Sequence, residues 1–367
     1  MSIDPPTPVL QKLRPRVAVE QMHEYHPPLA GRDGLRLDFN ENTFAPSPRV
    51  KAVLQRIAAE SLTKYPERQH VEVIAAKHFG LLPEAALLTN GVDEAIHLVC
   101  ETYLEPEDEV VIVTPTFSMY ALYAEATGAR VRAVQADNTL QFPYRRVLEA
   151  IQPSTRLIMI ASPNNPTGAV VESSILLELT TLAPQAALLV DEAYYHFYGA
   201  SVLSATATVP NLLVARTFSK VYGLAGLRIG LLAGHPEAMR FIRKVSSPYN
   251  VNSIALECLP EALADEAYIS WYADQVSRSR IAAEQALTRL KVPFWPSHAN
   301  FILMNIGSTH KAFVDSMRRQ GVLVRDRSSD PGCDGCVRIT LGIMEHTQQG
   351  LVALENTLKE LAWQPEN

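Results

Sequence analysis

Short runs of almost wholly apolar residues recur through the middle of the chain and alternate with amphipathic stretches that are long enough for a helix. The clearest of these runs are EVVIVTP, RLIMIASP, AALLVDE, NLLVARTFS and RIGLLAG. A strand with one wet face alternates apolar and polar residues, whereas a continuous apolar run is typical of a strand buried on both faces. The intervening stretches can supply the crossover helices that parallel strands need. The pattern therefore predicts an α/β fold in which a mainly parallel sheet is flanked by helices.

The chain divides by composition into three parts. Residues 1–47 are rich in proline, which predicts an extended arm, and helical periodicity begins at SPRVKAVLQRIAAESL. From about residue 255, long helical segments with short strands replace the apolar runs. Since 367 residues exceed what one hydrophobic core usually holds, we expect two domains of unequal size. We place the N-terminal arm at 1–47, the large domain at 48–258 and a smaller α+β domain at 259–367.

Charge and composition argue against several classes of protein. The net charge is −6 and both signs are spread along the chain, so there is neither a basic stripe for nucleic acid nor a polybasic membrane patch. No apolar run is long enough to span a bilayer and the N-terminus lacks an apolar signal core, so we expect a cytoplasmic protein. A nicotinamide or nucleoside-triphosphate enzyme is disfavoured because no glycine-rich phosphate motif of either kind follows a strand. The lone CxxC of Cys333 and Cys336 lacks a second ligand pair, so we expect no metal site.

Polar and aromatic residues follow the predicted strands. In parallel α/β sheets ligands bind at the carboxyl ends of the strands. The stretches found there are TNGVDEA, TPTFSMY, SPNNPTG, DEAYYHF and TFSK. They carry Asp93, Phe117, Asn165, Asp191, Tyr194, Ser219 and Lys220.

One end of this set suits a phosphate. Backbone N–H groups where Gly91, Val92 and Asp93 turn into a helix can bind an anion, and the Ser219 hydroxyl and the Arg228 guanidinium can add to them. The glycine- and alanine-rich link between Lys220 and Arg228 lets the backbone pass close to such a ligand.

The other end suits a flat heteroaromatic aldehyde. Phe117 can cover the ring, Asp191 can keep a ring nitrogen protonated, and the Lys220 amine can bond the aldehyde. Asn165 and Tyr194 can donate to a ring phenolate. The set therefore predicts pyridoxal 5'-phosphate, for which a lysine Schiff base and an acidic partner of the ring nitrogen are the signature. Alone, each residue has a plainer explanation, such as a helix cap for Asp191, and it is their common place at strand ends that favours the cofactor.

At these residues the sequence resembles the fold type I pyridoxal-phosphate aminotransferases of class I and II, and within them the histidinol-phosphate aminotransferases. The resemblance covers about residues 37–342. The stretches that carry it are LDFNENTFAPSP, KYPERQ, TNGVDEAIHLV, PTFSMYALYAEATGA, SPNNPTG, VDEAYYHF, TFSKVYGLAGLRIG, HANFILM, GVLVRD and VRITLG.

The resemblance implies a role for each matching residue. Lys220, Asp191 and Tyr194 are the implied catalytic residues, with Lys220 as the Schiff-base and proton-shuttling lysine. The cofactor would further contact Gly91, Val92, Asp93, Phe117, Asn165, Thr217, Ser219 and Arg228, with Tyr65 reaching in from the second subunit of a homodimer. The resemblance also implies that the arm packs with the small domain and with this partner subunit. The implied substrate-binding residues are Arg338 for an α-carboxylate, Arg325 for a distal anion, Tyr25 in the arm and Asn165.

The activity implied is transamination between histidinol phosphate and 2-oxoglutarate, a step of histidine biosynthesis. The alternatives are an aromatic amino acid aminotransferase on the same scaffold, a pyridoxal-phosphate decarboxylase that shares Lys220 and Asp191, and a non-enzymatic binding module. Two departures from the family's pattern bear on the substrate: Thr43 stands where the family commonly has proline, and the loop RDRSSDPGCDGC adds Arg327 and several acidic residues beside Arg325.

Overall fold

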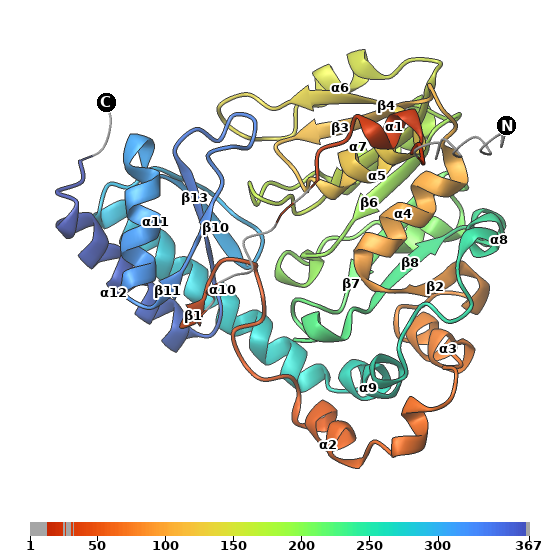
Figure 1. Ribbon diagram of the computed structural model, residues 1–367, viewed down its shortest axis with the longest axis horizontal. Helices are drawn as coiled ribbons and strands as arrows, with labels where there is room; N and C mark the ends of the chain where they lie inside the picture. Colours follow the sequence, from red (N-terminus) through yellow and green to blue (C-terminus); the bar gives the residue numbers. More distant parts are fainter. Residues whose placement is uncertain (1–12, 25, 27–30, 32, 365–367) are drawn as a thin grey trace, which may run out of the picture.

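A large, mostly parallel sheet lies at the centre of one half of the molecule (Figure 1). The computed structural model describes residues 13–24, 26, 31 and 33–364. Within these residues the sheet has the order β2 (Ala86–Thr89), β8 (Gly230–Gly234), β7 (Leu212–Thr217), β6 (Ala187–Asp191), β5 (Thr155–Ala161), β3 (Glu109–Thr114) and β4 (Arg130–Gln135). All neighbours pair in parallel except β8, which is antiparallel to both β2 and β7. The predicted α/β fold with a mainly parallel sheet is therefore confirmed.

The central strands are apolar because helices cover both faces of the sheet. Along β6, Leu189 packs into one buried cluster while Leu188 and Val190 pack into another on the opposite face. Helices α4 (Gly91–Tyr103), α5 (Met119–Thr127) and α8 (Pro236–Val245) contribute to the first cluster, and α6 (Tyr144–Ala150) and α7 (Ser173–Leu182) contribute to the second. Burial of both faces leaves the strand ends as the place where polar side chains gather.

Strand register brings the carboxyl ends of three strands to one edge. Ala161 at the end of β5 pairs with Asp191 at the end of β6, and Asp191 pairs with Ala215 in β7. The segments that follow these strands therefore start side by side, as the sequence pattern predicted.

A smaller antiparallel sheet forms the other half (Figure 1). Its strands lie in the order β12 (Arg325–Asp326), β13 (Cys336–Thr340), β10 (Phe301–Asn305) and β9 (Phe294–Trp295). The helices of this half are α10 (Glu266–Arg289), α11 (His310–Arg319) and α12 (Met344–Glu360). The predicted boundary at 258/259 falls inside α9 (Ser253–Leu263), a helix that continues the path toward α10, and the division into domains stays a prediction.

The arm joins the two halves. Strand β1 (Leu35–Arg36) pairs in parallel with β11 (Val322–Leu323), and the Thr340 N–H donates to the Leu37 carbonyl (2.9 Å). Further back, α1 (Val17–Glu20) contacts α5, and Arg16 donates to the Ala126 carbonyl beside the large sheet. The described parts of the arm thus contact both halves of the molecule.

The remaining helices and 3-10 turns are short. Their bounds are α2 (Pro48–Arg56) and α3 (Gln69–His78), with 3-10 turns η1 (Ala59–Leu62), η2 (Pro83–Ala85), η3 (Tyr195–Phe197), η4 (Leu203–Ala207), η5 (Ala225–Leu227) and η6 (Gly307–Thr309) along the chain. The Ser47 side chain accepts from the Arg49 N–H and caps α2, in which Pro48 occupies the first turn. Within the described residues, each helix is too short or too polar to cross a bilayer.

Candidate active site

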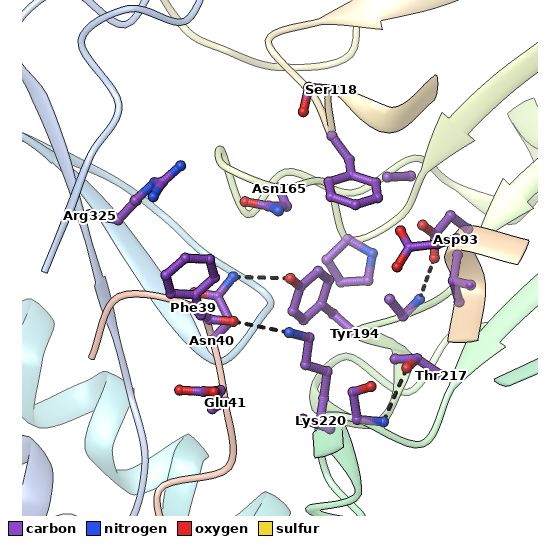
Figure 2. A pocket seen from close by; sticks show the side chains of 18 of the residues that line it. Phe39, Asn40, Glu41, Asp93, Ser118, Asn165, Tyr194, Thr217, Lys220 and Arg325 are labelled. Atoms are coloured by element: carbon purple, nitrogen blue, oxygen red, sulfur yellow. Dashed lines mark hydrogen bonds between the residues drawn. The ribbon is translucent and has the colours of Figure 1, made fainter. Parts of the chain in front are cut away.

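A cavity of about 400 Å³ opens at the carboxyl ends of β5, β6 and β7, between the two sheets. Three parts of the chain line it: the segments after the large-sheet strands, residues 39–41 of the arm, and Arg325, Arg327 and Arg338 of the small-sheet half. Figure 2 shows these groups converging, with Lys220 and Thr217 on one side, Asn165 opposite and Arg325 at the far end. The cavity is therefore the point where all three parts of the chain meet.

Lys220 projects into this cavity from the loop after β7 (Figure 2). Its Nζ donates to the Phe39 carbonyl (3.1 Å) and lies 5.7 Å from the centre of the Tyr194 ring. Within the described residues this amine forms a hydrogen bond with a neutral carbonyl rather than an ion pair with a carboxylate. An amine that projects into a cavity in this way can act as a nucleophile toward a bound ligand.

Asp191 is a buried carboxylate at the end of β6, with 6% of its surface exposed. It accepts hydrogen bonds from the Tyr120 hydroxyl (2.7 Å) and from the Ala193 N–H (2.9 Å). Burial raises the pKa of Asp191 to about 6, although both hydrogen bonds act in the opposite direction. A buried carboxylate of this kind is stabilised by a cationic partner, and the cavity is where such a partner can bind.

Aromatic and amide side chains fix the middle of the cavity. The Tyr194 hydroxyl accepts from Asn40 Nδ2 (3.0 Å), and its ring packs edge-on against Phe301. Phe117 lies at right angles to Tyr120, with ring centres 5.8 Å apart, and presents a ring to the cavity. These contacts leave little freedom to the side chains that a planar ligand would touch.

One end of the cavity is built to bind an anion. Gly91 begins α4 with a positive φ of 76°, and a Cβ atom there would lie 2.7 Å from Arg228 Nη2. Arg228 Nη2 in turn donates to Asp93 Oδ2 (2.7 Å). The Ser219 N–H donates to Thr217 Oγ1 (3.0 Å), and both side chains line the cavity. A helix N-terminus, two hydroxyls and a guanidinium therefore meet at one place.

The opposite end carries the arginines from the small sheet. Arg338, in β13 and only 4% exposed, donates to Asn165 Oδ1 and to the Asp38 carbonyl (2.6 Å), while its Nε has no hydrogen-bond partner among the described residues. Burial lowers the pKa of Arg338 to about 9, and the charges of Arg327 and Arg325 act in the same direction. The guanidinium of Arg325 lies over the Phe39 ring, 5.2 Å from its centre. This end of the cavity carries excess positive charge.

Most of the predicted site residues come together here. The cavity is lined by Val92, Asp93, Phe117, Asn165, Asp191, Tyr194, Thr217, Ser219, Lys220, Arg228, Arg325 and Arg338. Gly91 is adjacent to the Arg228 guanidinium. Tyr65 is not among the described residues that line it: its side chain is 82% exposed and stacks on Tyr249, with ring centres 4.6 Å apart. Tyr25 lies outside the described residues. The functional roles of all these residues stay predictions.

Several cavity residues were missed by the sequence analysis. Tyr120 follows Phe117 by three residues in the stretch TPTFSMY, so its position in the first turn of α5 was an available signal. Phe39 and Asn40 come from the arm, and Asn40 adopts a positive φ of 54°. Its amide reaches Tyr194 only because the arm folds over the site, which no local pattern reveals.

The remaining features have structural explanations. Cys333 and Cys336 are buried with Leu140 and Leu303, and within the described residues no group of three or more metal-ligating side chains is assembled. Thr43 Oγ1 accepts from the Ile343 N–H (3.1 Å), so the residue that departs from the family's pattern ties the arm to the small-sheet half.

Comparison of sequences identifies relatives along nearly the whole chain. The sequence profile of the family described as Aminotransferase class I and II matches residues 32–354. The histidinol-phosphate aminotransferase of Roseiflexus castenholzii is 36% identical, over 97% of this chain and 100% of the relative. That of Moorella thermoacetica is 33% identical, over 94% of this chain and 91% of the relative.

Comparison of structures finds the same fold. Histidinol-phosphate aminotransferase from Sinorhizobium meliloti, solved in complex with pyridoxal-5'-phosphate, superposes with a TM-score of 0.85 at 23% identity, over 95% of this chain and 98% of that chain. A single mutant of Thermus thermophilus aspartate aminotransferase superposes with a TM-score of 0.80 at 26% identity, over 95% and 100% of the two chains.

Proposed function

This chain belongs to the aminotransferase class I and II family, and we propose that it transfers an amino group from histidinol phosphate to 2-oxoglutarate. The enzyme is a pyridoxal-phosphate-dependent transferase, as this family is. The proposal for the substrate is supported by curated relatives that act on histidinol phosphate and are 31–36% identical to this chain. The observation that carries it is the cation-rich end of the cavity, where Arg325 and Arg338 face the same space as Lys220.

The residues present fit the cofactor. Asp191 is buried and its pKa is raised, so it lacks the cationic partner that a protonated pyridine nitrogen supplies. Because Gly91 has no side chain, the Arg228 guanidinium can lie beside the first N–H groups of α4. A guanidinium next to a helix N-terminus suits a phosphate. We assign Lys220 to the aldehyde, Asp191 to the ring nitrogen, and Asn165 and Tyr194 to the ring oxygen. We further assign Phe117 to the ring face, and Gly91, Val92, Asp93, Thr217, Ser219 and Arg228 to the phosphate end.

Bound in this way, the cofactor supplies an electron sink for the charge left when the substrate loses its Cα proton. The chain's own residues prepare that step. With the substrate amine bonded to the cofactor aldehyde, Lys220 Nζ would be free to accept the substrate Cα proton and to donate it to the aldehyde carbon. Asp191 would hold a proton on the ring nitrogen through its negative charge in a dry site, where electrostatic stabilisation is strong. The Tyr194 hydroxyl accepts from Asn40 Nδ2 and would donate its own proton toward the ring oxygen.

Two substrates must share this site in turn. Histidinol phosphate and glutamate both place an anion far from the reacting nitrogen, so Arg325 can serve both of them. Arg338 is required only for the substrate that has an α-carboxylate. Its buried Nε, which has no partner among the described residues, is available for that carboxylate.

A substrate panel tests the proposal. The amino donors are histidinol phosphate, phenylalanine and tyrosine, each with 2-oxoglutarate, and glutamate formation is measured. We expect kcat/KM for histidinol phosphate to exceed that for phenylalanine by about 100-fold, since the apolar side chain of phenylalanine leaves the distal cation Arg325 without an anion. Equal or better use of phenylalanine would identify an aromatic aminotransferase. Release of carbon dioxide without an oxo acid would identify a decarboxylase.

Arg325→Ala tests the role of the distal cation. We expect kcat/KM to fall by about 10- to 100-fold for histidinol phosphate and for glutamate, because each loses a charged hydrogen bond worth about 1.5–3 kcal/mol. Apolar donors should lose far less. Equal losses across the panel would show that Arg325 supports the fold and does not bind the anion.

We also propose that the enzyme is a homodimer in which Tyr65 completes the partner's site. Tyr65 is the most exposed large aromatic side chain in its surroundings, and Tyr249 and Leu62 beside it are more than half exposed. Such a patch on a globular chain marks an interface. In this arrangement Tyr65 would add a hydroxyl to the phosphate end of the partner's cavity. That would explain why Tyr65 does not line the cavity of its own chain.

A further inference from the structure

A third guanidinium reaches the substrate end of the cavity from the loop after β12. Arg327 lines the cavity together with Arg325 and Arg338, and its side chain is only 13% exposed. Its terminal Nη2 pairs with Asp330, while its Nε is buried without a hydrogen-bond partner among the described residues. A guanidinium with a spare buried donor beside a cavity can accept one more anionic ligand.

The loop that carries Arg327 is fixed from both ends. Three successive turns close it, in which N–H groups of Asp330, Cys333 and Cys336 each donate to the carbonyl three residues earlier, at 2.8–3.0 Å. The Arg327 N–H donates to the Cys336 carbonyl (2.9 Å), which brings the start of the loop to its end. Buried Cys333 and Cys336 anchor it on Leu303 of the small sheet. Arg327 is therefore held beside the cavity by the backbone.

The charges at this end do not balance. Asp330 is close enough to all three arginines that each of them lowers its pKa, although burial outweighs them and raises it. Three guanidiniums face one carboxylate, which leaves an excess of two positive charges in a largely buried place. Buried charges of one sign are costly unless an opposite charge joins them. Glutamate can supply two negative charges here, its α-carboxylate to Arg338 and its distal carboxylate to Arg325. Histidinol phosphate has no α-carboxylate, so its phosphate must supply both charges.

We propose that Arg327 is a specificity-determining residue that binds the second negative charge of a phosphate monoester at the substrate end of the cavity. A phosphate monoester carries about −1.5 to −2 charges at pH 7 and three terminal oxygens, whereas a carboxylate carries one charge and two oxygens. Arg325 suffices for a distal carboxylate, and Arg327 adds affinity when the distal group is a phosphate. The inference rests on the proposed function, because it assigns the part of the site that prefers histidinol phosphate over a dicarboxylic donor.

Kinetics of Arg327→Gln test the inference. For the variant and the native enzyme, kcat/KM is measured for histidinol phosphate and for glutamate as amino donors. The loss for histidinol phosphate should exceed the loss for glutamate by about tenfold or more, as expected for one charged hydrogen bond. Arg319→Gln is the matched control, since Arg319 pairs with Glu360 at the surface with 61% of its side chain exposed, and it should move neither value. Equal losses for the two donors in Arg327→Gln would overturn the inference.

Binding of two unreactive probes gives a second measurement. Propyl phosphate and butyrate differ in their anionic group, and calorimetric titration of the holoenzyme gives a Kd for each. The native enzyme should bind propyl phosphate more tightly as pH rises through about 6, where the phosphate gains its second charge, and Arg327→Gln should lose most of that gain. The charged groups at this end are Arg325, Arg327, Arg338 and Asp330, and Glu41 of the arm and Lys220 line the same cavity.

The two measurements separate the possible failures. If the native enzyme does not use histidinol phosphate at all, the proposed function is wrong. If it does, and Arg327→Gln retains the native pH dependence for propyl phosphate, only the role of Arg327 is wrong. Unchanged butyrate binding by the variant demonstrates that it has folded, and Arg327→Lys, which keeps the charge without the planar fork, should recover part of the loss.

Discussion

At the scale of single residues, burial of Asp191 carries an electrostatic cost that depends on pH below neutrality. Its folded-state pKa of about 6 lies above the ordinary value of 3.8, because burial disfavours the charged form. Between these two pH values the folded protein binds more protons than the unfolded chain. Stability without the cofactor therefore falls as pH rises from about 4 to about 6, and the full cost, at most about 3 kcal/mol, is present above that range.

Asp191→Asn removes this cost and the pH dependence with it. Freed of cofactor, the variant should have a higher Tm than the native protein at pH 8, and the difference should shrink toward pH 5 as Asp191 becomes protonated. With added pyridoxal phosphate, the native protein should have the higher Tm at pH 8, because only the Asp191 carboxylate can form an ion pair with the ring nitrogen. Scanning calorimetry at several pH values measures both effects. A constant difference across this pH range would show that the Asp191 carboxylate is not the group that titrates.

The residues that could be predicted are those adjacent to a strand end. Asp191, Asn165 and Lys220 follow strands that the apolar runs mark, so their convergence follows from parallel topology alone. Asn40 and Arg327 could not be found in this way. They reach the cavity from the arm and from a loop, and their places depend on contacts between distant segments rather than on any local period.

At the scale of elements, the start of α4 depends on a glycine. Gly91→Ala would strain a backbone at φ 76° and place a Cβ atom 2.7 Å from Arg228 Nη2. We expect a loss of about 1–2 kcal/mol in stability from the left-handed conformation, together with a weaker Kd for pyridoxal phosphate as Arg228 is displaced. Fluorescence titration with the cofactor and thermal unfolding measure the two effects separately.

Gly80→Ala is the control for backbone strain. Gly80 has a similar positive φ of 68°, but nothing lies within 4 Å of the position that its Cβ would take. It should lose stability to a similar extent and bind the cofactor as the native protein does. Equal weakening of cofactor binding in both variants would show that the space beside Arg228 is not what matters at Gly91.

The elements were predictable to different degrees for a physical reason. Strands β3, β5, β6, β7 and β8 were all found from their apolar runs, since burial on both faces removes polar residues from them. Edge strand β4 is largely exposed and has no such run. The antiparallel direction of β8 could not be predicted either, because an apolar run reads the same whichever way the strand lies in the sheet. Pairing of β1 with β11 joins distant parts of the chain and leaves no local signature.

At the scale of the whole molecule, the proposed homodimer makes a prediction about mixtures. Tyr65→Ala and Lys220→Ala each damage a different part of a site that two subunits would share. In a mixed dimer one site carries both mutations and the other carries neither. Refolding an equal mixture should therefore restore about a quarter of native activity, since half of the dimers have one intact site of two. Activity that stays at the mean of the two separate variants would place Tyr65 outside the partner's site.

The central claim concerns the whole catalytic apparatus, which is arranged around the amine of Lys220. The most direct test is borohydride reduction of the purified holoenzyme, followed by proteolysis and mass spectrometry to locate the pyridoxyl group. We predict a single modified lysine, Lys220, and no stable labelling of Lys220→Ala under the same conditions. A pyridoxyl group on another lysine of the native enzyme, or none on any, would contradict the account.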